Sequence, residues 1–274
     1  MIRGCLVLGV LWCAGAASAA GAQPLLVEAL QRHGVALPER GFEGAFDDGL
    51  APVTPIGPGS LAAPLALLAT GTRAERINAA YAFGVLAGQS AKGVAPEELG
   101  AAVQVLTEMI GGPDRRSRIA GARVAGRVLA VPLAAAPVPA PPAGLLAALF
   151  GLLNQSNETE QLAAMDALGR LRQVQAVPSL TERYYFYREA GRRAEAGGAL
   201  EALARIGDPS SVALVQAVAA DRWAEGRDPT ALAADFARAR LLKDGSVARI
   251  RQALDDRSRR VQARAYLIEL GPEP

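Results

Sequence analysis

Arginine recurs at one position of a repeated, alanine-rich sequence phrase. In four successive copies the arginine directly follows a small residue, and these arginines are Arg127, Arg170, Arg205 and Arg238. A guanidinium can bind a carboxylate or phosphate group through two parallel hydrogen bonds. The four residues are therefore candidate binding residues, and an anionic polymer is one candidate ligand. The alternative is that each arginine pairs with acidic residues of neighbouring copies while its stem covers apolar surface.

Two carboxylates also share a place in the repeated phrase. Asp166 and Glu201 each lie one helical turn before the arginine of their copy, so they could face each other across adjacent helices. A pair of facing carboxylates can carry out general acid–base catalysis. This pattern makes an enzyme, or an accessory subunit with carboxylate chemistry, the main alternative function. Ion pairing with the neighbouring arginines is the structural alternative.

The segment 183–188, Arg-Tyr-Tyr-Phe-Tyr-Arg, gathers aromatic residues. On a helix, four consecutive side chains point around the whole circumference, so they cannot all face one core. At least one or two should be partly exposed, and exposed tyrosine beside arginine is typical of interaction hot spots. Tyr184, Tyr185 and Tyr187 are therefore further candidate binding residues. Packing between helices is the alternative.

The rest of the sequence offers few groups for catalysis or metal binding. The chain has one histidine, His33, and two cysteines, Cys5 and Cys13, near its start. No nucleophile elbow, zinc-binding His-Glu motif, phosphate-binding loop or dinucleotide-binding glycine pattern occurs in it. We therefore predict no catalytic residue, no metal ligand and no cofactor. A formal net charge of +2 over 274 residues argues against a nucleic-acid partner, which usually requires a dense basic field.

The first 22 residues are predicted to be a signal peptide. Arg3 precedes an apolar run over residues 5–14 that is short for a membrane span, and Ala-x-Ala cleavage sites follow at 17–19 and 20–22. An uncleaved membrane anchor is one alternative, and a lipoprotein signal at Cys13 is another, although the bulky Trp12 before that cysteine departs from the small residue of such signals. Because every later apolar run is shorter than about 18 residues, we expect no membrane span after signal removal. The protein should be exported, to the periplasm or the cell exterior.

The repeated phrase has apolar and small residues at helical spacing, as Ala163, Ala167 and Leu171 illustrate. Its small residue recurs at intervals of 33 to 43 residues, at positions 84, 126, 169, 204 and 237. A second short apolar helix is expected before each copy, over residues 61–70, 96–110, 144–153, 178–190, 210–223 and 246–254. No stretch shows the sustained alternation of a strand, so we predict an all-α fold. Repeats of this length predict a solenoid of about six helical hairpins.

Residues 198–212, GALEALARIGDPSSV, resemble a HEAT repeat of the kind first noted in phycobilisome lyases. Residues 163–180 resemble it nearly as well, and the copies together cover about residues 58–271. The resemblance implies a right-handed α-solenoid, whereas it says little about function. The His-Glu pairs that bind iron in deoxyhypusine hydroxylase, a HEAT-like enzyme, do not occur in this sequence.

The sequence therefore divides into a signal peptide (1–22), an N-terminal helix with an extended leader or cap (23–57) and a HEAT-like solenoid (58–271). A proline-rich insert at 131–143 should be extended, and it is either a passive loop or a docking strand. We expect an exported, non-catalytic scaffold that binds a protein partner in the cell envelope. The carboxylate enzyme and the binder of anionic polymers remain the alternatives.

Overall fold

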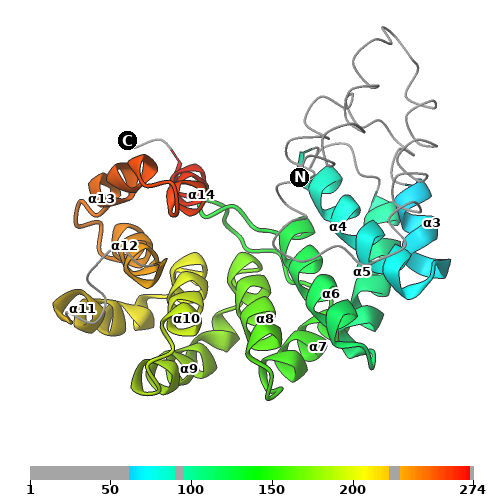
Figure 1. Cartoon of the computed structure of the whole chain (residues 1–274), viewed down its shortest axis with the longest axis horizontal. Coiled ribbons are helices and arrows are strands. Elements are labelled where there is room, and N and C mark those ends of the chain that lie inside the picture. Colours follow the sequence, from blue (N-terminus) through cyan, green and yellow to red (C-terminus); the bar gives the residue numbers. More distant parts are fainter. Residues whose placement is uncertain (1–61, 90–95, 222–228, 272–274) are drawn as a thin grey trace, which may run out of the picture. The chain divides into compact units, whose positions relative to one another are not determined.

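The computed structural model describes residues 62–89, 96–221 and 229–271, and all regular structure within these ranges is helical (Figure 1). Twelve α-helices, α3 to α14, occur there together with short 3₁₀ turns. The prediction of an all-α fold is confirmed for this part of the chain. The predicted signal peptide and the predicted leader, with His33, lie outside the described residues. In the same three ranges, no helix combines the length and the hydropathy that a membrane crossing requires.

The chain forms two compact units, residues 1–124 and 125–274, and the division falls inside α6. The described helices of the first unit are α3 (Ala62–Thr70), α4 (Arg73–Gln89), α5 (Pro96–Gly111) and most of α6 (Arg115–Val128). α3 packs against both α4 and α5. The core of this unit includes Leu68, Phe83 and Leu106, which are fully shielded from solvent. Asp114 caps α6 because its carboxylate accepts a hydrogen bond from the Ser117 N–H (2.8 Å).

The second unit is a series of paired helices. These are α7 (Ala143–Leu153), α8 (Glu158–Arg170), α9 (Val177–Glu189), α10 (Arg193–Ile206), α11 (Val212–Ala220), α12 (Pro229–Leu241), α13 (Val247–Gln252) and α14 (Arg260–Leu270). α7 packs against α8, α9 against α10, α11 against α12 and α13 against α14. The second helices of three pairs also pack in a row, with α10 between α8 and α12 (Figure 1). In this row, the apolar face of a second helix is therefore buried by the first helix of the same pair and by the second helix of the neighbouring pair.

Small residues let neighbouring second helices approach closely. A Cβ atom added to Gly169 of α8 would lie 2.7 Å from the Cα atom of Ala202 in α10, and one added to Gly126 would lie 2.6 Å from the Cα atom of Ala167 in α8. A side chain at either position would overlap the backbone of the next helix, so only glycine fits without a shift. Packing between neighbouring helices therefore explains the small residue of the repeated phrase.

The proline-rich insert, which is part of the second unit, forms no helix from residue 131 to 142 and packs against helices of that unit. Arg172, which follows α8, donates a hydrogen bond from Nη1 to the Ala135 carbonyl oxygen (2.6 Å). Arg240 of α12 donates from Nη2 to the Leu133 carbonyl oxygen (3.0 Å). The Leu133 side chain packs against the apolar core that α10 to α14 share. The insert therefore bridges the end of α8 and α12.

Candidate functional site

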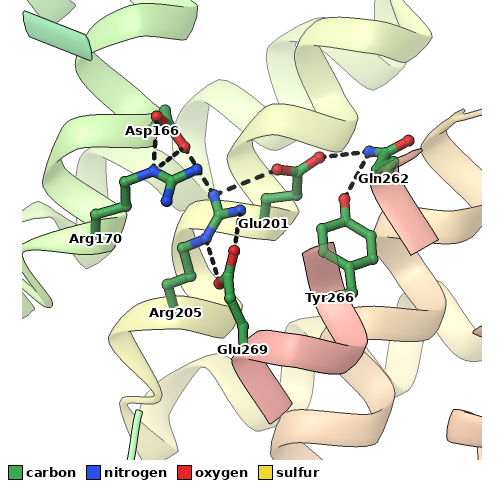
Figure 2. A network of polar contacts seen from close by, with 7 residues as sticks. All are labelled: Asp166, Arg170, Glu201, Arg205, Gln262, Tyr266 and Glu269. Atoms are coloured by element: carbon green, nitrogen blue, oxygen red, sulfur yellow. Dashed lines mark hydrogen bonds and ion pairs between the residues drawn. The ribbon is translucent and has the colours of Figure 1, made fainter. Parts of the chain in front are cut away.

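Arg205, in the last turn of α10, is the centre of a polar network in the second unit (Figure 2). Its side chain is only 4% exposed. The guanidinium forms a bidentate ion pair with Glu269 of α14, from Nε to Oε2 (2.8 Å) and from Nη2 to Oε1 (3.0 Å). Nη1 contacts Asp166 Oδ1 of α8 at 2.9 Å and Glu201 Oε2 of α10 at 3.3 Å. Carboxylates from three helices therefore hold one buried cation.

The network extends beyond Arg205. Towards α8, Arg170 donates from Nε to both oxygens of Asp166, at 3.0 and 2.9 Å. Towards α14, Gln262 donates from Nε2 to Glu201 Oε1 (2.9 Å) and to the Tyr266 hydroxyl oxygen (2.7 Å). We call the whole set the Arg205 network, and its members are Asp166, Arg170, Glu201, Arg205, Gln262, Tyr266 and Glu269 (Figure 2).

An aromatic pair borders the network on its apolar side. The rings of Phe236 in α12 and Tyr266 in α14 are stacked, with centroids 4.3 Å apart and planes 14° from parallel. The Arg205 Cζ atom lies 5.8 Å from the Phe236 centroid, within the range of a cation–π contact. Because the rings exclude water, the ion pairs of Arg205 act in a medium of lower dielectric than bulk water.

The surroundings shift the pKa values of several groups in the network. Burial alone would lower the pKa of Arg205, but the nearby carboxylates of Asp166, Glu201 and Glu269 outweigh burial and raise it. The guanidinium is therefore charged at physiological pH. Burial raises the pKa of Tyr266 well above its usual value of 10.0, and the Glu201 carboxylate raises it further. The Tyr266 hydroxyl is therefore neutral at physiological pH.

The four arginines of the repeated phrase do not lie in one environment. Arg170 and Arg205 converge on Asp166. Arg238 pairs instead with Asp244 in the loop after α12, from Nε to Oδ2 at 2.7 Å. Arg127 lies half-buried in the last turn of α6. Arg205 thus contacts carboxylates of neighbouring copies, as the structural alternative expects, whereas Arg170 and Arg238 contact carboxylates of their own copy or of the loop that follows it. The binding role of all four stays a prediction.

The structure divides the aromatic segment of α9 between core and surface. Tyr184 and Tyr187 are buried, whereas Tyr185 is 45% exposed and Phe186 is 57% exposed. The expectation that one or two of these side chains are partly exposed is confirmed. The Tyr187 hydroxyl donates a hydrogen bond to Oε1 of Gln161 in α8. Burial raises the pKa of Tyr184 to about 12, so both buried tyrosines act as packing groups with neutral hydroxyls.

The two candidate acid–base residues are brought together, but through a cation. Asp166 and Glu201 both contact Nη1 of Arg205. Both carboxylates are thus engaged by a guanidinium, whereas a general acid or base must be within reach of a substrate proton. In the three described ranges, no group of three or more His, Cys, Asp or Glu side chains is arranged to hold a metal ion.

Sequence reasoning missed Glu269, the residue that makes the bidentate contact with Arg205. It is 64 residues away from Arg205 in the sequence, in the last copy of the repeated phrase. The residue spacing of that copy does not indicate that the Glu269 side chain of α14 points towards α10. No family model matches the chain, and no curated protein matches it.

Proposed function

We propose that the chain is an exported scaffold built as a right-handed α-solenoid of about six HEAT-like hairpins. The observation that carries this proposal is the row formed by α8, α10 and α12, in which each helix packs against the next. In a solenoid each repeat contacts its neighbours, and the stacked repeats bury one continuous core. The close approach of α8 and α10 at Gly169 agrees with this architecture.

The scaffold acts by presenting a rigid surface to a protein partner in the cell envelope. The Arg205 network supports this role because it joins α8, α10 and α14 through buried ion pairs. A surface that is already ordered loses little conformational entropy when it binds. The exposed rings of Tyr185 and Phe186 supply the aromatic contact area that is typical of interaction hot spots.

Affinity capture from a cell-envelope extract tests the proposal. The tagged full-length chain, expressed in its own host, should retain a partner that an excess of untagged chain displaces. N-terminal sequencing of the exported protein should show processing near residue 22. Recovery of no displaceable partner, together with turnover of a substrate by the purified chain, would overturn the scaffold proposal.

The two alternative functions receive less support from the geometry. A carboxylate enzyme needs Asp166 or Glu201 to be available to a substrate, and both contact Arg205. A binder of anionic polymers needs its arginines to face the ligand, and Arg170 and Arg238 face carboxylates of this chain. Each alternative would require these ion pairs to open first.

A further inference from the structure

The outward face of α9 carries a compact group of aromatic and acidic side chains. Glu182, Tyr185, Phe186 and Glu189 are all exposed, and their spacing of i, i+3, i+4 and i+7 places them on one face of the helix. The two rings lie in the middle of this face and one glutamate lies a turn away on each side. We call these four residues the α9 outer patch.

The aromatic residues of the patch are only partly covered by the fold. The inward face of α9 already buries Leu180, Tyr184 and Tyr187, and α9 packs against α10 along that side. Tyr185 and Phe186 keep about half of their surface in water. The remainder of each ring packs edge-on against a buried neighbour, Tyr184 for Tyr185 and Tyr187 for Phe186. Val174 and Pro178, before and at the start of the helix, are also exposed. Exposed aromatic side chains gathered on one helix face, unlike apolar residues scattered singly, are typical of interaction sites.

The charge of the patch is negative because the flanking arginines are held elsewhere. Arg183 donates from Nη2 to the Leu153 carbonyl oxygen of α7 (3.1 Å). Arg188 pairs with Asp221 after α11, from Nε to Oδ2 at 2.8 Å. The outward face is therefore left with the carboxylates of Glu182 and Glu189.

We propose that the α9 outer patch binds a basic segment of the partner protein that also carries apolar side chains. Lysine or arginine side chains of that segment would lie against the faces of Tyr185 and Phe186, which attract cations through their ring quadrupoles. Further basic residues would pair with the glutamates at the two ends of the patch. The inference rests on the proposed scaffold function and names the chemistry of the partner.

A labelled peptide binding assay tests this inference on the full-length chain. The probe is an amphipathic helical peptide of lysine and leucine, and its counterpart has glutamate in place of lysine. The unmodified chain should bind the lysine peptide and not the glutamate peptide. The double substitution Tyr185→Ala/Phe186→Ala should weaken binding about tenfold or more, as expected for the loss of a hot spot. The double substitution Glu182→Gln/Glu189→Gln should weaken binding at low salt and flatten its dependence on salt.

A matched control separates the patch from general surface stickiness. Val261→Ala/Ile268→Ala removes two exposed apolar side chains from α14 in the same unit and should leave peptide binding unchanged. Circular dichroism should show the same helix content for every variant. The Tyr185→Ala/Phe186→Ala variant should have a lower thermal midpoint, because about half of each ring is buried, so binding is measured at a temperature at which every variant is folded. Equal binding by the Tyr185→Ala/Phe186→Ala variant and the unmodified chain would overturn the inference, as would tight binding of the glutamate peptide or no binding of the lysine peptide.

The same variants distinguish failure of this inference from failure of the scaffold proposal. If the Tyr185→Ala/Phe186→Ala variant still captures the displaceable envelope partner, the scaffold proposal stands and the partner binds elsewhere. If neither the variant nor the unmodified chain captures a partner, the scaffold proposal itself fails. Binding of the unmodified chain to neutral phospholipid vesicles, lost in the aromatic variant, would assign the patch to a membrane surface and overturn the peptide inference.

Discussion

Arg205 is a buried cation whose stability depends on its carboxylate partners. Desolvation of a charge costs several kcal/mol, and only close, well-aligned partners offset it. Asp166, Glu201 and Glu269 supply these contacts from three helices. The network therefore contributes to the geometry of the second unit more than to its net stability, since a buried ion pair is costly to form and costly to break.

Replacement of Arg205 by alanine should destabilise the protein by about 3 kcal/mol, because three carboxylates are left without their shared cation. Arg170→Ala is the matched comparison, since Arg170 pairs with Asp166 but is 28% exposed, and it should cost about 1 kcal/mol or less. Urea unfolding at neutral pH measures both changes. A cost for Arg205→Ala no larger than that for Arg170→Ala would contradict this account of the network.

Asp114 should make stability depend on pH in the acid range. Burial would raise its pKa, but hydrogen bonds from Arg73 and from the side chain and N–H of Ser117 outweigh burial and lower the pKa to about 2. Because the pKa of Asp114 is lower in the folded than in the unfolded chain, its contribution to the free energy of unfolding is complete above about pH 4 and is lost as the pH falls towards 2.

Asp114→Asn keeps the helix cap but removes the charge, so it should flatten this acid dependence. Asp114→Ala should in addition cost about 1 kcal/mol at neutral pH. Acid titration followed by circular dichroism measures the slopes, and an unchanged slope in Asp114→Asn would count against the proposed contacts.

The sequence was informative about which residues pair, and less so about where they meet. Ion pairing of Asp166 and Glu201 with neighbouring arginines was the structural alternative to acid–base chemistry, and Asp166 does pair with Arg170. The pairing of Arg205 with Glu269 was out of reach, because the rotation of α14 about its axis depends on the stacking of Tyr266 on Phe236. Side-chain contacts between distant helices are set by packing, which a spacing pattern in one segment does not contain.

At the scale of the helices, we expect the substitution of glycine by alanine to have opposite effects on stability at two positions, Gly169 and Gly151. Gly169→Ala places a methyl group 2.7 Å from the Cα atom of Ala202 and should destabilise the protein by about 1–3 kcal/mol, since backbone must shift. Gly151, inside α7, has no atom within 4 Å of an added Cβ, so Gly151→Ala should stabilise it by about 0.5–1 kcal/mol through helix propensity. Thermal and urea unfolding measure both. Stabilisation by Gly169→Ala would show that α8 and α10 do not approach as closely as described.

The proline-rich insert should loosen when its anchor on α12 is removed. Arg240→Ala deletes the hydrogen bond to the Leu133 carbonyl oxygen, and a charged hydrogen bond of this kind contributes about 1.5–3 kcal/mol. The amides of residues 133 to 135 should therefore exchange with solvent faster in hydrogen-exchange mass spectrometry. Arg264→Ala, at an exposed position of α14, is the control and should leave their exchange unchanged. Equal exchange in both variants would mean that Leu133 packing and the Arg172 hydrogen bond hold the insert without Arg240.

The helices were largely predictable, whereas the anchoring of the insert was not. Expected ranges 144–153 and 178–190 correspond to α7 (Ala143–Leu153) and α9 (Val177–Glu189) within one residue at each end. Such segments are defined by their own apolar spacing and by proline or glycine at their ends. Arg172 and Arg240, in contrast, donate to backbone carbonyl oxygens. Every residue carries that acceptor, so no side-chain pattern reveals the contact.

At the scale of the whole molecule, a repeated architecture determines how a local defect affects the stability of distant helices. In a solenoid, stability is approximately a sum of repeat and nearest-neighbour terms, so a local defect is felt most by adjacent repeats. In a single globular domain, the helices open together in one cooperative step. The row of α8, α10 and α12 is compatible with the first behaviour, and the position of Gly169 between α8 and α10 allows a direct test.

Gly169→Ala should therefore produce a graded pattern of hydrogen exchange across the second unit. Protection should fall most in α8 and α10, which meet at the substituted position, less in α12, and least in α13, which contacts α12 but lies beyond this row. The gradient follows because each pair of helices can open while more distant pairs stay packed. Hydrogen-exchange mass spectrometry of the full-length chain measures the change helix by helix, with Gly151→Ala as the variant that should lower no protection. A uniform loss of protection from α7 to α14 would show one cooperative domain, and the solenoid proposal, together with the extended display surface that follows from it, would then be wrong.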